Sequence, residues 1–174
     1  LGAAPSVELK AEANSFAWTA QRAGETVTPL LNQPAAETLA ARLGITPRVE
    51  PDLREVYLGD WEGATFESLR GAGNVMEQLV RNPDFTAPNG ESQNLVKKRM
   101  VEAIEEITHR HPQQNILIVA HGVSIGIALS HLIDGDTTRW PKYSKANTAF
   151  SELCLNTRTL LSYNRTDHLE AGEH

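Results

Sequence analysis

NILIVAHGVSIGIALSHLI, residues 115–133, is the stretch of sequence that decides the fold of this chain. After Asn115 the run to Ala120 is continuously apolar, which is typical of a β-strand covered on both faces. A tight turn at His121 and Gly122 then leads into a helix predicted over residues 123–133. A buried strand that passes directly into a helix indicates an α/β protein.

The residues on either side of this unit predict further helices and strands. Ser92 is expected to cap a helix that runs to about His111. Residues 151–155 and 160–163 alternate as short strands do, which suggests an antiparallel edge. Together these elements predict a three-layer α/β/α sandwich with a mostly parallel sheet and an antiparallel edge. The buried stripe of the capped helix is predicted to be Leu95, Val96, Met100, Ala103, Ile104 and Ile107.

The first ninety residues carry weaker signals. We find no internal repeat and no linker in the chain, so residues 1–174 are predicted to form a single domain. Gly44 is a typical helix stop, and Pro51 closes the extended segment before it. In chain order we expect a helix at 1–15, a short strand at 15–20, a helix at 33–43, a strand at 45–49, an interrupted helix at 66–80 and a loop at 81–90.

Composition narrows the possible classes of function. The formal net charge of −6 disfavours a general nucleic-acid binder, which needs a basic surface. No apolar run approaches the roughly 20 residues that span a bilayer, so no membrane partner is expected. The single cysteine, Cys154, excludes an internal disulfide framework and a cysteine-based zinc site. One cysteine is compatible with a reducing cytoplasm, which is the location we expect.

His121 occupies a position that favours an anion. In open α/β sheets, ligands bind at the carboxyl ends of the strands, and His121 follows such a strand directly. The N–H groups and the dipole at the start of the next helix also favour negative charge there. The alternative is a histidine that only hydrogen-bonds the turn.

Residues 52–63 read DLREVYLGDWEG and form a second candidate region. Five of the twelve residues are charged, yet the segment also holds leucine, valine, tyrosine and tryptophan. It is therefore predicted to pack on the protein while it holds carboxylates at a cleft. Glu55, placed beside a phosphoester oxygen, would protonate the leaving group as a general acid. The alternative is an ordinary surface ion pair between Arg54 and Glu55.

Four motifs occur along roughly residues 45–163. They are Leu53-Arg54-Glu55 followed by Gly59-Asp60-Trp61-Glu62-Gly63, then Asn89-Gly90-Glu91-Ser92, Val119-Ala120-His121-Gly122 and Asn147-Thr148-Ala149. Together, and in this order, they resemble the motifs of the histidine phosphatase superfamily, which is phosphoglycerate mutase-like. The resemblance implies a phosphoglycerate mutase-like fold and a phosphohistidine mechanism that needs no metal and no cofactor.

The resemblance also implies roles for single residues. His121 is the family's second histidine, which binds the phosphoryl group together with Gly122, and Glu55 is the proton donor. Glu91 and Ser92 lie near the substrate pocket, and Asn147 lies near its rim. The implied partner is a small phosphorylated substrate or inorganic phosphate, bound by a monomer or homodimer. Because the loop at 81–90 offers no obvious cap, a phosphatase is favoured over a mutase.

The family's N-terminal Arg-His-Gly motif is absent, and no histidine precedes His109. Residues 22–26 read RAGET and allow two explanations. They are either that motif with alanine in place of histidine, or the family's later Arg-Ala-x-x-Thr element. Only 26 residues separate Thr26 from Leu53, which leaves room for one helix and one strand. Spacing favours the second explanation, with Arg22 as a phosphate ligand. The alternative is a plain surface arginine.

Under the favoured explanation, the family's first strand and its attacking histidine would lie upstream of Leu1. That strand belongs in the middle of the sheet, so its loss would expose strand edges. Residues 1–20 either supply a substitute, or the sequence omits residues of the real protein. In both cases we expect this polypeptide to be a poor or inactive phosphatase.

Two other functions compete with the phosphatase. Because the histidine is missing, the chain is also a candidate pseudophosphatase that binds a phosphorylated ligand without turnover. Residues 122–126 match Gly-x-Ser-x-Gly between a strand and a helix, the context of a serine hydrolase that uses Ser124. Asp134 or Asp136 and then His168 would complete its triad. Against it, the last 41 residues leave little room for that fold.

Three further groups of residues suggest no special chemistry. His109 and His111 end a helix, where cations suit the helix dipole, and we expect no metal there. Residues 97–99, Lys-Lys-Arg, are predicted to form a solvated helix face. Trp140 and Pro141 are predicted to serve packing.

Overall fold

The computed structural model describes the backbone of residues 6–12 and residues 36–37, 40–42, 44, 46–64, 69, 74–143 and 146–167. The strand predicted at 15–20 and the candidate phosphate ligand Arg22 lie outside these residues.

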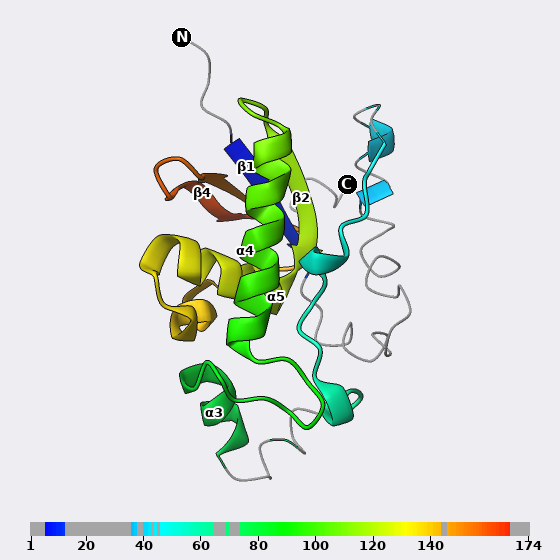
Figure 1. The fold of residues 1–174 in the computed structure, drawn as a ribbon. Helices are drawn as coiled ribbons and strands as arrows, with labels where there is room; N and C mark the ends of the chain where they lie inside the picture. Colours follow the sequence, from blue (N-terminus) through cyan, green and yellow to red (C-terminus); the bar gives the residue numbers. More distant parts are fainter. Residues whose placement is uncertain are drawn as a thin grey trace.

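The described strands form one sheet in the order β2-β1-β3-β4 (Figure 1). β1 and β2 pair in parallel, whereas β3 is antiparallel to both β1 and β4. Three strands thus point one way and β3 the other, so the predicted α/β class with an antiparallel element is confirmed.

The strands are β1 Ser6–Glu12, β2 Ile116–His121, β3 Ala149–Cys154 and β4 Thr159–Arg165. The helices are α3 Val75–Arg81, α4 Gln93–Arg110 and α5 Gly122–Leu129. Short helical turns are η2 Pro51–Leu53, η3 Gly59–Trp61, η4 Ser130–Asp134 and η5 Thr137–Tyr143.

β1 occupies the middle of the sheet, between β2 and β3. The helix predicted over 1–15 is therefore wrong for Ser6–Glu12. The reason is visible in the sequence SVELKAE, where apolar and charged residues alternate with the period of a strand. Glu12, the last residue of β1, pairs in register with His121. The chain thus supplies its own central strand, as required if residues 1–20 substitute for the family's first strand.

α4 matches its prediction closely. The Ser92 hydroxyl accepts a hydrogen bond from the Leu95 N–H at 3.2 Å, and the helix ends at Arg110. Leu95 itself is 53% exposed, so its place in the predicted stripe is wrong. Arg99 is buried instead, because it lies on the flank of the stripe that faces residues 52–55. The remaining members of the stripe are buried at Val96, Met100, Ala103 and Ile104 and half-buried at Ile107.

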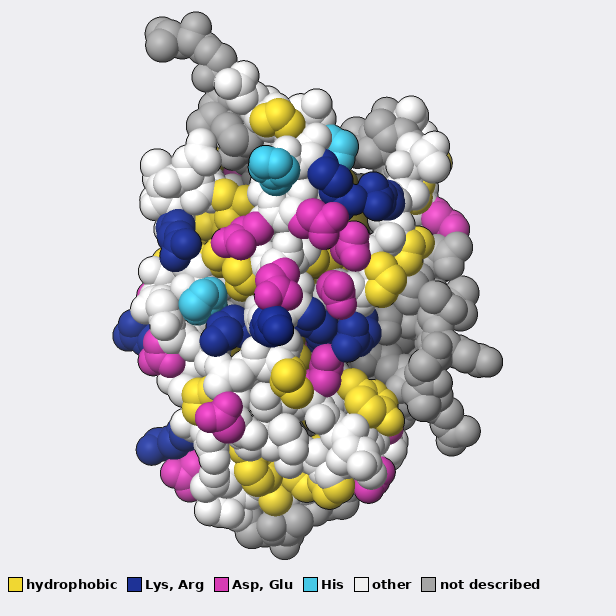
Figure 2. All heavy atoms as spheres, viewed as in Figure 1, with side chains coloured by type: hydrophobic (Ala, Val, Ile, Leu, Met, Phe, Trp, Pro, Cys, Tyr) yellow, Lys and Arg dark blue, Asp and Glu magenta, His cyan; other side chains and the backbone are white. Residues whose placement is uncertain are grey.

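α4 and α5 contact each other, and α5 also contacts β1 and β2, so the core lies between these helices and the sheet (Figure 1). All residues of α5 from Ser124 to Leu129 are buried. The outer face of α4 presents intermixed acidic and basic side chains (Figure 2). Lys98 on this face is exposed, as predicted for a solvated helix surface.

The segments before α3 agree with their predictions in part. Residues 36–37 and 40–42 are helical and are followed by Gly44 at φ 67°, as predicted for a helix stop. Residues 46–50 form no strand, because Pro47 and the following Pro51 each lack an N–H for a ladder. Residues 82–92 form a loop, which agrees with the loop predicted at 81–90 except at Arg81, the last residue of α3. Within the described residues, no helix has the length and apolar character to cross a membrane.

Candidate active site

The carboxylate of Glu55 lies at the N-terminus of α5, directly beside His121. Its Oε2 accepts a hydrogen bond from the Val123 N–H at 3.0 Å, and its Oε1 accepts one from the Ser124 N–H at 2.8 Å. The Val56 N–H also donates to Oε1, at 2.9 Å. Glu55 and His121 are only 4% and 2% exposed. The structure thus brings together two residues that lie 66 positions apart in the sequence.

This carboxylate is held there by the end of the helix. The first N–H groups of α5 have no partner within the helix, and the helix dipole favours negative charge beside them. His121 precedes the helix in extended conformation, and its side chain does not cap it. Glu55 therefore occupies the anion position that the sequence predicts for a phosphoryl oxygen.

Burial lowers the pKa of the His121 imidazole, and the nearby positive charge of Arg99 lowers it further. The negative charge of Glu55 acts in the opposite direction but is outweighed. The Nδ1 atom of the ring is buried without a hydrogen-bond partner among the described residues. The site therefore holds a buried imidazole that is near the charges of both a carboxylate and a guanidinium.

Arg99 hydrogen-bonds the segment that carries Glu55, and the sequence did not predict these contacts. Its guanidinium binds Glu91 with both Nε and Nη2, at 2.8 Å each. The same group donates to the backbone carbonyls of Asp52, Arg54 and Glu55 at 2.8–2.9 Å. The prediction of a solvated face is wrong for this residue, because its side chain is 9% exposed. The position of Arg99 on the flank of the apolar stripe was the one signal available.

Glu91 and Ser92 use their side chains within the protein. The Glu91 carboxylate accepts hydrogen bonds from Arg99, from Arg54 at 2.7 Å and from the Tyr57 N–H at 3.0 Å. Burial alone would raise the pKa of Glu91, but these arginines and the amide outweigh it and lower the pKa. Ser92 is the N-cap of α4. Glu91 thus binds the segment that carries Glu55 through Arg54 and Tyr57, whereas Ser92 caps α4.

Two of the motifs pack against each other through Gly59. Its φ is +54°, and a Cβ at this position would lie 2.1 Å from the carbonyl oxygen of Pro88. The Asp60 N–H donates to the same oxygen at 2.9 Å, and the Asn89 side chain donates to the Asp60 carboxylate at 3.1 Å. The glycine therefore permits a backbone contact that joins residues 59–63 to residues 88–92.

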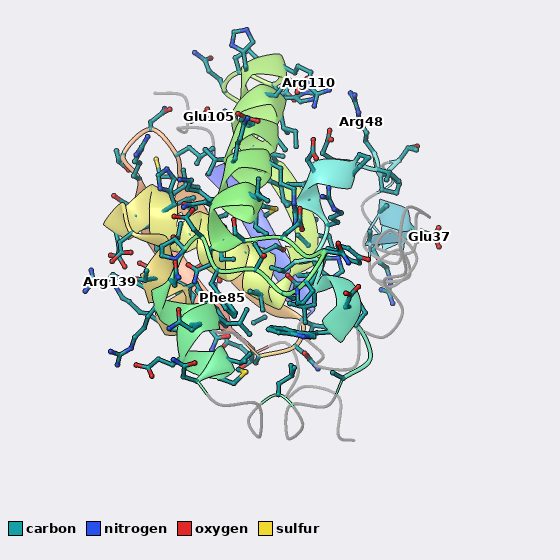
Figure 3. The ribbon with its side chains drawn as sticks, turned by 60° about the horizontal axis from the view of Figure 1, so that its bottom comes forward. Glu37, Arg48, Phe85, Glu105, Arg110 and Arg139 are labelled. Carbon is teal, nitrogen blue, oxygen red and sulfur yellow. The ribbon has the colours of Figure 1, made fainter. Side chains whose placement is uncertain are left out.

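A cavity of about 780 Å³ borders His121. Most of its wall is apolar and comes from β2, α4 and residues 46–53. Arg54 also lines it, as do Arg110 and Arg48, which lie at one end of the molecule (Figure 3). Arg110 forms an ion pair with Glu50 at 3.6 Å. The cavity is therefore a largely apolar space that borders the buried imidazole and has arginine side chains in its wall.

The remaining candidate residues are placed as follows. Gly122 is the first residue of α5. Asn147 lies in an exposed turn before β3. Because Ala149 pairs with Ala11, this turn lies at the end of the sheet where β1 and β2 finish. β1 separates this turn from His121, a span of about 10 Å across two strand spacings. Within the described residues, no hydrogen bond joins Asn147 to His121 or Glu55.

The geometry does not support Ser124 as a nucleophile. The residue is fully buried, and its hydroxyl donates to the His121 carbonyl at 3.3 Å. Asp134 binds Tyr143 and Lys142, and Asp136 binds Thr138. His168 lies outside the described residues. A serine nucleophile must face its substrate, so the Gly-x-Ser-x-Gly match is explained by close packing of α5.

No cluster of three or more metal-binding side chains occurs in the part of the chain that the structure describes. The polar groups at the sheet edge are instead an imidazole, a carboxylate and two guanidinium groups. They lie at the carboxyl end of a strand, which is where open α/β folds bind their ligands.

The chain belongs to the histidine phosphatase superfamily (branch 1), whose family profile matches residues 18–165. One relative is the uncharacterized phosphatase PhoE of Bacillus subtilis, 29% identical over 122 residues, which cover 68% of this chain and 57% of the relative. Another is the glucosyl-3-phosphoglycerate phosphatase of Mycobacterium tuberculosis, 29% identical over 115 residues, which cover 61% and 52%. The chain thus spans about half the length of these curated relatives.

Solved structures of similar fold include the mycobacterial glucosyl-3-phosphoglycerate phosphatase in complex with VO3. It superposes with a TM-score of 0.70 at 18% identity, covering 94% of this chain and 100% of that one. Bacillus stearothermophilus YhfR superposes with a TM-score of 0.72 at 19% identity, covering 91% and 95%. These similarities show that the fold is that of the family.

Proposed function

We propose that the protein is a phosphatase that hydrolyses a small phosphomonoester through a phosphohistidine. The observation that carries the proposal is the Glu55 carboxylate on the N-terminal N–H groups of α5, beside His121. His121 and Gly122 would bind the phosphoryl group, and Glu55 would protonate the leaving oxygen. The match to the family profile and the names of the relatives support the phosphatase class.

In the proposed reaction, the family's Arg-His-Gly histidine attacks phosphorus with an imidazole nitrogen while the bond to the leaving oxygen breaks. Residues 1–108 contain no histidine, so residues 1–174 by themselves are expected to carry out this step poorly or not at all. That oxygen takes the proton of Glu55. Water then attacks the phosphohistidine, Glu55 takes a proton from the water, and inorganic phosphate is released. Arg54 lines the cavity beside His121 with a side chain that is 37% exposed, so it is a further cation for the phosphoryl oxygens. Arg22 is proposed as another phosphate ligand, and Asn147 as a residue of the rim.

A second candidate function is a pseudophosphatase that binds a phosphorylated ligand without turnover. It is favoured by one specific observation, which is that residues 1–108 contain no histidine to accept the phosphoryl group. Glu91 and Ser92 are proposed to lie near the substrate pocket in both functions. A cytoplasmic location and a monomeric or homodimeric state complete both proposals.

The test is incubation of the protein with a ³²P-labelled phosphomonoester, followed by analysis of acid-labile protein-bound label. Binding of vanadate and inorganic phosphate is measured in parallel by calorimetry, with His121→Gln as the binding-site variant. Acid-labile label and phosphate release support the phosphatase. Binding without label, lost in His121→Gln, supports the pseudophosphatase. Absence of both binding and label would overturn both candidates.

A further inference from the structure

We propose that Arg99 is a positioning residue that holds the Glu55 carboxylate against the N-terminus of α5. Its importance for catalysis or ligand binding rests on the proposed function, but the arrangement itself is stated for the folded protein. In this view the site at the end of β2 is built jointly by α4 and α5, and residues 52–55 are clamped between these helices.

The hydrogen bonds of Arg99 support this role. An arginine side chain has five N–H donors, and the structure gives five bonds from this guanidinium. Two bonds go to the two oxygens of Glu91, and three go to the backbone carbonyls of Asp52, Arg54 and Glu55. One buried cation therefore satisfies three carbonyls of a single short segment.

The segment needs such an anchor because residues 54–58 belong to no helix or strand. The backbone carbonyl of Glu55 accepts from Arg99 at 2.9 Å, while its side chain accepts from Val123 and Ser124. Glu55 is thus fixed on one side by α4 and on the other by α5. Without the guanidinium, three buried or half-buried carbonyls lose a donor and the hold on the Glu55 backbone is lost.

Lysine cannot reproduce this arrangement. Its ammonium has three donors around one point, whereas the guanidinium is a planar fork that spans the Glu91 carboxylate and the carbonyls. Arg99→Lys keeps the charge and the aliphatic stem, so it separates the effect of charge from the effect of geometry. Lys98→Gln is the matched control, because Lys98 is the neighbouring residue on the same helix and is exposed.

The readout is hydrogen exchange of the Val123 and Ser124 amides, which donate to Glu55 and have no partner within the helix. A merely structural arginine would change exchange over the whole protein in proportion to stability. We expect these two amides to exchange about tenfold faster in Arg99→Gln, the factor that corresponds to losing one hydrogen bond. Amides of the β3–β4 pair should change less. In Arg99→Lys, the exchange rates of the two amides should lie between those of the wild type and of Arg99→Gln. In Lys98→Gln they should equal those of the wild type.

Unchanged exchange of both amides in a folded Arg99→Gln protein would overturn the proposal. If that variant does not fold, Glu91→Gln is measured instead, because it weakens the hydrogen bonds that Arg99 donates to the Glu91 carboxylate. Faster exchange of the two amides would then support the proposal, and unchanged exchange would overturn it. Binding of inorganic phosphate is measured on the same samples. If the amides exchange as expected but the wild-type protein neither binds phosphate nor forms acid-labile label, only the proposed function is refuted.

Discussion

At the scale of single residues, Glu55 determines the charge and the hydrogen bonding at the start of α5. Two of its partners are the N–H groups that an anionic ligand would use at the start of α5. In the proposed site, a phosphoryl group and this carboxylate would therefore compete for the same donors. The buried imidazole of His121 lies beside them, so protonation and ligand binding at this point are coupled.

We predict that Glu55→Gln increases the affinity for inorganic phosphate about tenfold and lowers any phosphatase turnover by about 10²–10⁴-fold. The amide carries no negative charge to repel the ligand and no proton to give to a leaving group. Calorimetry and a phosphate-release assay measure the two effects. Glu102→Gln, an exposed carboxylate on α4, controls for net charge. Weaker phosphate binding in Glu55→Gln would contradict the competition.

We predict that the protein loses stability as the pH falls through the range just below 6.5. The pKa of His121 is lowered in the folded state, chiefly by burial, so the unfolded chain binds more protons in this range. Each unit by which that pKa is lowered corresponds to about 1.4 kcal/mol. Urea unfolding between pH 7 and pH 5 measures the slope. His121→Gln should reduce this slope and leave a smaller one, because burial also lowers the pKa of His131. His109→Gln, at an exposed position, should leave the slope unchanged. An equal slope in both variants would refute the assignment.

At the scale of elements, helices were predicted well where capping and apolar spacing agree. Ser92 and the stripe that begins at Val96 located α4 to within one residue at each end. Leu95 and Arg99 were placed wrongly because spacing does not show which flank of the stripe a neighbouring segment covers. That neighbour is the loop at residues 52–55, far away in the sequence.

We predict that Gly59→Ala destabilises the fold by about 3 kcal/mol or more, since it combines a positive φ with a clash against backbone. Gly63→Ala is the matched control. Its φ is +82°, but nothing lies within 4 Å of the added Cβ, so only the conformational cost of about 1–2 kcal/mol applies. Chemical denaturation of both variants gives the comparison. Equal losses would mean that the contact between residues 59 and 88 is not rigid.

At the scale of the whole molecule, the sheet depends on β1. This strand separates β2 from β3 and pairs with both of them. β1 brings two segments to the same end of the sheet. One is the end of β2, which carries His121, and the other is the start of β3, which follows Asn147. Pairing between sequence positions more than a hundred residues apart thus assembles the end of the sheet that carries the proposed site.

We predict that Lys10→Pro destabilises the protein by about 2 kcal/mol or more, because proline removes a donor from a strand with neighbours on both sides. Lys10→Ala keeps the N–H and is the control. Thermal unfolding followed by circular dichroism and by tryptophan fluorescence measures the change. Coincident transitions in the wild type would support the prediction of a single domain over residues 1–174. A Lys10→Pro protein as stable as Lys10→Ala would show that β1 is not central.

The sequence by itself determined the elements whose signals are local, such as α4, the β2–α5 turn and the loop before Ser92. It also determined the family, because four motifs in a fixed order are hard to match by chance. Only the tertiary structure decided that the Glu55 carboxylate binds the N-terminal N–H groups of α5, that Arg99 is buried and that Ser6–Glu12 forms the central strand. These outcomes depend on contacts between distant segments, and neither periodicity nor capping contains information about which segments will meet.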